Sequence, residues 1–121
     1  MSKLVFKSID LPEVLERVQD DRELLLELFD IFQTDFEEKR KEIEEFLKQK
    51  NFSGLRDIIH SVKGAAGNIS AKPLHVICSQ IEAFAERQEL SEINATMPGL
   101  DKEYAQLLQD MDQIRKQFKK G

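Results

Sequence analysis

His60 is the residue of this sequence best placed for nucleophilic chemistry. Histidine side chains titrate near pH 6.5 in general, so an exposed imidazole offers a free lone pair near pH 7. Lys63 follows three residues later, with Gly64 and Gly67 close behind it. On a helix, a lysine at that spacing lies on the neighbouring ridge and can offset the roughly two negative charges of a phosphoryl group. The pattern is compatible with a histidine that accepts a phosphoryl group on an open surface.

Helical periodicity predicts that His60 points away from the core. If Leu55 marks the centre of the buried stripe, His60 lies at about 140°, Gly64 at about 180° and Gly67 at about 120° around the helix. Lys63 and Arg56 flank them on one side. A glycine inside a helix costs about 1 kcal/mol against alanine, so two on one exposed face favour a flat patch that a partner approaches closely. Close packing of another helix, or a C-terminal cap at Gly67, are the alternatives.

Three segments carry a resemblance to one protein family. The segment 60–69, His-Ser-Val-Lys-Gly-Ala-Ala-Gly-Asn-Ile, resembles the signature of histidine-containing phosphotransfer (HPt) domains, whose core is a histidine, a lysine three residues on, and a glycine directly after it. Residues 21–29 resemble the second helix of that family, and 78–82, Cys-Ser-Gln-Ile-Glu, its fourth. One departure is Ser70, where many members have glycine. The resemblance covers nearly the whole chain.

The resemblance implies a phosphocarrier rather than an enzyme. By it, His60 is the phosphoacceptor, Lys63 stabilises the phosphohistidine, and Glu82 contacts the histidine ring. The implied partners are the receiver domains of response regulators, with a hybrid histidine kinase as a further candidate, and the receiver supplies Mg²⁺. The chain itself needs no cofactor and no metal. It has no phosphate-cradling loop motif, so we expect no ATP-dependent kinase activity. The expected docking surface comprises Arg56, Gly64, Gly67, His75 and Glu82.

The elements that must position these residues are helices. Apolar residues recur at spacings of three and four nearly throughout, which predicts a short helix over 11–19 and longer ones over 21–49, 52–68, 71–88 and 92–118. Short connections then favour an all-α, antiparallel up-down four-helix bundle, with the short N-terminal helix covering one end. Pro98-Gly99 interrupts the last apolar seam. Either the last helix starts there, or one helix runs through the proline and is kinked at it. The seam keeps its register across the proline, which favours one kinked helix. We expect a single domain over 1–121.

Composition excludes several classes of protein. The 121 residues are 40% hydrophobic and 34% charged, with a formal net charge of −5. An acidic balance argues against nucleic-acid binding, and no apolar run approaches the roughly 20 residues of a membrane span. The N-terminus lacks the apolar core of a secretory signal, and the single cysteine, Cys78, fits a reducing compartment. We expect a cytoplasmic monomer; Met1 slightly favours a free-standing protein over a domain of a larger kinase.

Rival interpretations remain open for several of these residues. A carboxylate-bridged metal bundle needs Glu-x-x-His pairs, but the nearest match, Asp57 with His60, faces outward and has no second copy. A helical docking module without phosphorylation would use the same glycine patch and leave His60 incidental. His75 lies at the edge of the apolar stripe of its helix, where it is either part of the docking surface or a boundary residue without a role. Cys78 is predicted to be a small core residue. The apolar side chains of the short first helix either join the docking surface or only cap the bundle: Leu11, Val14, Leu15 and Val18.

Overall fold

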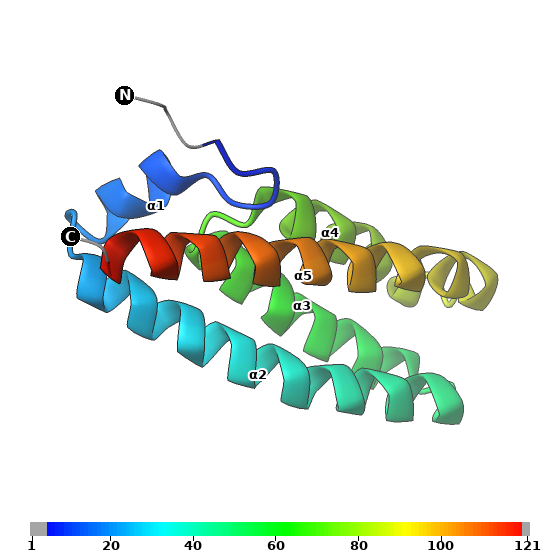
Figure 1. The fold of residues 1–121 in the computed structure, drawn as a ribbon. Helices are drawn as coiled ribbons and strands as arrows, with labels where there is room; N and C mark the ends of the chain where they lie inside the picture. Colours follow the sequence, from blue (N-terminus) through cyan, green and yellow to red (C-terminus); the bar gives the residue numbers. More distant parts are fainter. Residues whose placement is uncertain (1–4, 120–121) are drawn as a thin grey trace.

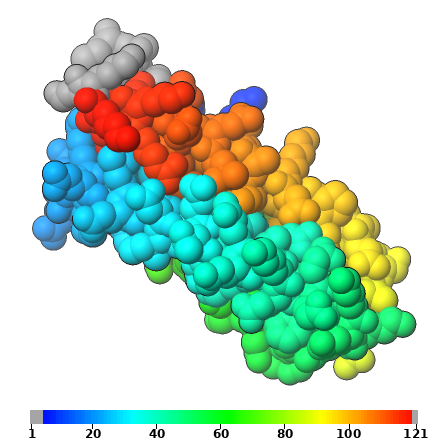
Figure 2. Space-filling view, turned by 60° about the horizontal axis from the view of Figure 1, so that its bottom comes forward, coloured from blue at the N-terminus to red at the C-terminus, as the bar shows by residue number. Residues whose placement is uncertain are grey.

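The computed structural model describes residues 5–119, and all regular structure within them is helical. The helices are α1 (Leu11–Arg17), α2 (Arg22–Gln49), α3 (Phe52–Asn68), α4 (Lys72–Glu86) and α5 (Leu90–Lys119). Helices α2 to α5 form the bundle, and α1 lies at the end where α2 begins and α5 ends (Figure 1). Figure 2 shows α2 and α5 side by side along one elongated face. The predicted fold class is confirmed.

Side-chain caps start the first three helices. Asp10, Asp21 and Asn51 each accept a hydrogen bond from the backbone N–H three residues on, at 3.1, 3.0 and 2.9 Å. These bonds satisfy N–H groups that have no partner inside the helix. The caps fix the residues at which α2 and α3 begin.

Two helices end earlier than the sequence predicts. Helix α1 ends at Arg17 rather than residue 19, because Gln19 and Asp20 take positive φ values of 54° and 61°. Helix α4 ends at Glu86 rather than residue 88, where Gln88 has φ 56°. The last helix begins at Leu90, two residues before the predicted start. Residues other than glycine seldom adopt this left-handed conformation, so the sequence carries little sign of these stops.

Helix α5 runs without a break through Pro98. The proline has no N–H, so the carbonyl oxygen of Asn94 loses its helical donor, but Asn94 is exposed and water can take its place. Two residues earlier, the Thr96 hydroxyl donates to the carbonyl oxygen of Glu92 at 2.8 Å. The apolar seam therefore belongs to one helix, as its register predicted, and does not start at the proline.

The core is made by one face of each helix. Its largest fully buried side chains come from all four long helices: Phe29, Leu25, Ile43, Leu55, Ile59, Leu74, Ile81, Ile93, Leu100, Leu107, Met111 and Ile114. Several apolar side chains of the helices are only half-buried at its margin: Leu28, Phe46, Leu47, Ile58, Ile77, Phe84, Tyr104 and Phe118. The broad apolar stripe of each helix extends beyond what its neighbours cover.

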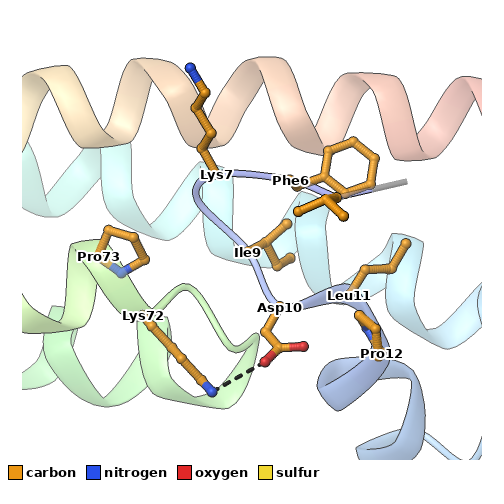
Figure 3. A pocket seen from close by; sticks show the side chains of 9 residues that line it. Phe6, Lys7, Ile9, Asp10, Leu11, Pro12, Lys72 and Pro73 are labelled. Atoms are coloured by element: carbon orange, nitrogen blue, oxygen red, sulfur yellow. Dashed lines mark hydrogen bonds and ion pairs between the residues drawn. The ribbon is translucent and has the colours of Figure 1, made fainter. Parts of the chain in front are cut away.

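The segment before α1 is tied to the bundle by a buried carboxylate. Asp110 of α5 is 5% exposed, and its Oδ2 accepts from the backbone N–H and the hydroxyl of Ser8 at 3.0 and 2.5 Å. A hollow of about 580 Å³ opens between this segment and the start of α4, where Lys72 reaches Asp10 at 3.2 Å (Figure 3). Residues 5–7 and 9–12, with Lys72 and Pro73, line it. It includes none of the predicted site residues.

Candidate functional site

His60 lies on the outside of α3, as the periodicity predicted. The core face of α3 consists of Leu55, Ile59, Val62 and Ala66, all buried. His60 follows Ile59 by about 100° around the helix, and its side chain remains 67% exposed. A ring held this far out of the core is accessible to a large partner as well as to small molecules.

Glu82 of α4 bridges two of the predicted site residues of α3, His60 and Lys63. Its Oε2 lies 2.7 Å from Nδ1 of His60, and its Oε1 accepts from Nζ of Lys63 at 2.6 Å. Helices α3 and α4 share the most extensive contact between described helices, which places this carboxylate against α3. The predicted contact between Glu82 and the histidine ring is therefore present, and Lys63 joins the same cluster.

The bridging carboxylate is ionised at neutral pH. Partial burial raises the pKa of Glu82, but the hydrogen bonds from Lys63 and His60 and the positive charge of Lys63 lower it by more, so its pKa lies below the ordinary glutamate value. The side chain is only 16% exposed, and both of its oxygens are engaged. Glu82 is thus a fixed anion rather than a mobile surface charge.

An ionised carboxylate determines which nitrogen of His60 is free. Such a group can only accept hydrogen bonds, so Nδ1 must carry the proton that it donates to Glu82. In the neutral ring, the lone pair available for chemistry is then on Nε2. The arrangement presents one nucleophilic atom, on a ring that is 67% exposed.

The two glycines differ in their surroundings. A Cβ at Gly64 would meet no other atom within 4 Å, so this position is open surface. A Cβ at Gly67 would lie 3.4 Å from Cδ2 of His75, and the Gly67 carbonyl accepts from Arg17 of α1 at 2.7 Å. Gly67 lies inside α3, which ends at Asn68, so a C-terminal cap at Gly67 is the wrong alternative. The open patch is centred on Gly64.

Other predicted docking residues are less closely joined to the cluster. Arg56 pairs with its neighbour Asp57 at 3.1 Å. His75 is half-buried, with its ring facing Gly67. Their roles in docking stay predictions.

Helix α1 caps the bundle with half of its apolar side chains. Leu11 and Val14 are buried, so they are not available to a partner, and the docking alternative is wrong for these two. Leu15 and Val18 are half-buried against the core. Leu15 in α1 and Val18, the residue directly after it, are the two of these four apolar side chains that keep some surface exposed.

Sequence reasoning missed the contact of Lys39 of α2 with Ser61, the residue that follows His60 on α3. Its Nζ lies 2.5 Å from the hydroxyl of Ser61, next to His60, and 2.8 Å from Asp35. Its position three residues after Phe36 and four before Ile43, both buried, was the signal that it lies at the edge of the packed stripe.

Cys78 is a small core residue, as predicted. It is fully buried, and burial, with a further contribution from the nearby Glu82 charge, raises the pKa of its thiol to about 12. The thiol is therefore protonated and inert at neutral pH.

Comparison with known proteins decides the family. The family model described as Hpt domain matches residues 27–117. The chain belongs to the Hpt domain family. Among solved structures, it is similar to histidine-containing phosphotransfer protein B (HptB) from Pseudomonas aeruginosa PAO1, with a TM-score of 0.79 and 28% identity, covering 92% of this chain and 96% of that one.

A curated relative agrees with this Hpt assignment. The phosphorelay intermediate protein rdeA of Dictyostelium discoideum is 23% identical over 115 residues, which are 95% of this chain. The chain spans 45% of the length of that relative. Within residues 5–119, no helix has the length and hydrophobicity needed to cross a membrane. In the same range, no group of three or more histidine, cysteine, aspartate or glutamate side chains is arranged to hold a metal ion.

Proposed function

We propose that this Hpt domain is a phosphocarrier of a multistep phosphorelay, with His60 as its phosphoacceptor. The observation that carries the proposal is the exposed His60 ring, whose Nδ1 is held by Glu82 while Nε2 remains free. The family and the relatives described above support the same activity. Both comparison proteins are named for phosphotransfer or for a phosphorelay.

The proposed reaction is a reversible transfer between aspartate and histidine. The Nε2 lone pair of His60 attacks the phosphorus of a receiver's phospho-aspartate, the N–P bond forms, and the P–O bond breaks with its electron pair left on the aspartate carboxylate. A second receiver's aspartate reverses these steps. Phosphoryl transfer depends on positioning and on stabilisation of charge. Lys63, 24% exposed beside the ring, supplies one positive charge on this chain, and the receiver supplies its Mg²⁺.

The partners we propose are receiver domains, with a hybrid histidine kinase as a further candidate. A receiver is a folded protein, and the open surface at Gly64 lets its active site approach the backbone of α3. We propose no ATP-dependent kinase activity for this chain, no membrane or nucleic-acid binding, and a monomer in the cytoplasm.

The test is transfer from a labelled receiver. Purified receiver domains charged with radioactive phosphate in the presence of Mg²⁺ are mixed with the native chain and with His60→Gln. We expect label to move to the native chain and not to the variant. His75→Gln is the matched control, because it removes the second histidine and should still accept label. Partner capture that persists in His60→Gln, with no transfer to the native chain from any receiver, would instead support a docking module without phosphorylation.

A further inference from the structure

We propose that residues 5–17, the N-terminal arm, open from the bundle as one unit, and that the buried side chain of Asp110 is the latch that holds this arm closed. The arm consists of the irregular segment 5–10 and helix α1. It lies outside residues 27–117, which the Hpt family model matches. The inference concerns a conformational change of the fold and does not depend on the phosphorylation of His60.

The bundle can keep its core when the arm leaves. The largest fully buried side chains all belong to the four long helices, α2 to α5. The arm adds three further apolar side chains to the core, Ile9, Leu11 and Val14. Among the described helices, α1 has the least contact with the others. Segments with few buried apolar contacts open locally at a lower free energy than the whole domain unfolds.

The bonds between Ser8 and Asp110 hold the arm closed at its start. Oδ2 of Asp110 accepts from the backbone N–H of Ser8 at 3.0 Å and from its hydroxyl at 2.5 Å, and Oδ1 accepts from Gln106 at 3.0 Å. Ser8 is 2% exposed and Asp110 is 5% exposed, so the closed arm keeps water away from these bonds. Without the Asp110 acceptor, two buried donors of Ser8 would lose their partner, and a buried donor without a partner is strongly unfavourable.

A second set of contacts ties the arm to the turn between α3 and α4. The backbone N–H of Asp10 donates to the Ser70 carbonyl at 2.9 Å, and Arg17 donates to the Gly67 carbonyl at 2.7 Å. Glu13 accepts from the Ser70 hydroxyl at 2.8 Å. The side chains of Arg17 and Glu13 are 50% and 34% exposed, so water can replace their bonds. The bonds to Asp110 are buried on both sides, which makes Asp110 the latch.

The connection between α1 and α2 is suited to be the hinge of this movement. Gln19 and Asp20 follow one another with φ values of 54° and 61°. The left-handed conformation strains residues other than glycine, and opening lets both residues relax, so the strain favours the open arm. Opening also withdraws Arg17 from Gly67, one of the predicted docking residues. The state of the arm therefore changes the surface at this end of α3.

The test is native-state hydrogen exchange of the whole chain, followed by NMR at urea concentrations below the unfolding transition. The reporter amides of the arm are those of Ser8, Asp10 and Val14, which donate hydrogen bonds in the closed state. The reporters of the core are amides in the middle of α3. We expect the arm amides to exchange through an opening of lower free energy than the core amides. Their exchange should also depend less on urea, because opening exposes little surface.

Two substitutions separate the latch from a general loss of stability. Asp110→Ala removes the acceptor, and we expect the arm amides to exchange at least about tenfold faster. Core amides should also exchange faster in this variant, because complete unfolding breaks the latch too. Ile93→Val is the matched control, since it trims a fully buried side chain at the start of α5, at the opposite end of the bundle from the arm (Figure 1). Its contacts survive when the arm opens, so it should speed the core amides several-fold and leave the arm amides at the native rate.

Each of three results would overturn the proposal. In the native chain, arm amides with the same opening free energy and urea dependence as core amides would show that the arm is not a separate unit. This measurement needs no variant, so it also covers the case in which Asp110→Ala does not fold. Arm amides at the native rate in folded Asp110→Ala would exclude Asp110 as the latch. Arm amides that accelerate together with the core in Ile93→Val would show that the arm opens only when the bundle unfolds.

Discussion

Gly64 allows a prediction in which stability and function move in opposite directions. Glycine inside a helix is about 0.8 to 1.0 kcal/mol less favourable than alanine. A Cβ at Gly64 would meet nothing within 4 Å, so no clash offsets the gain. We therefore expect Gly64→Ala to raise the free energy of unfolding by about 1 kcal/mol and the midpoint of thermal unfolding by about 3 to 6 °C.

The assay is urea and thermal unfolding followed by circular dichroism at 222 nm, with Gly54→Ala as the matched comparison. A Cβ at Gly54 would lie 2.6 to 2.9 Å from three atoms of the Phe46 ring, so the whole ring must move. Overpacking of this kind costs about 1 to 3 kcal/mol, which exceeds the gain in helix propensity. We expect Gly54→Ala to be less stable than the native chain.

The functional half of the prediction uses a larger side chain. Gly64→Gln should fold and accept phosphate from phosphoramidate at the native rate, because a small donor needs no flat surface. Its transfer from a receiver domain should fall by at least tenfold. A Gly64→Ala chain no more stable than native, or a Gly64→Gln chain that exchanges with receivers at the native rate, would refute the account of this glycine.

Three further predictions concern the rest of the fold. Ser70 has the left-handed φ value of 58°, and its hydroxyl donates to Glu13 at 2.8 Å. Both Ser70→Gly and Ser70→Ala lose this hydrogen bond, but only glycine also relieves the strain of the left-handed backbone. In urea unfolding, Ser70→Gly should therefore be more stable than Ser70→Ala by about 1 kcal/mol. The hydrogen bonds from Lys72, and then from Ser70, lower the pKa of Glu13, so the stability from this carboxylate is present above the ordinary glutamate range and lost as the pH falls below about 4.5. The stability difference between native protein and Lys72→Met should therefore shrink between pH 6 and pH 3, and a constant difference would contradict it. Cys78, with its pKa raised to about 12, should resist iodoacetamide at pH 8 until the chain is unfolded, as mass spectrometry can show.

The sequence predicts most of the fold because the bundle is built from local regularities. Apolar spacing locates the helices, and the register of the seam through Pro98 favours one helix, which α5 is. Helix ends at left-handed residues such as Gln88 cannot be predicted from the sequence, because glutamine does not indicate a positive φ. Ser70 has the same conformation, with φ 58°, which a glycine would adopt without strain.

Only part of the candidate site can be predicted from the sequence. The exposure of His60 follows from the face of the helix on which it lies, and its contact with Glu82 was implied by the family resemblance. The second bond of Glu82 to Lys63, and the reach of Lys39 to Ser61, depend on how deeply neighbouring helices pack. Inter-helix depth is set by many side chains at once, so spacing along one helix cannot predict it.

The most direct test of the account is chemical phosphorylation of the chain by phosphoramidate, read on a phosphate-affinity gel. Native protein and His75→Gln should show a shifted band that is labile to acid and stable to alkali, and His60→Gln should show none. Fragmentation by mass spectrometry should place the phosphate on His60. A folded native chain that stays unshifted, or a shift that survives in His60→Gln, would contradict the assignment of His60 as the phosphoacceptor.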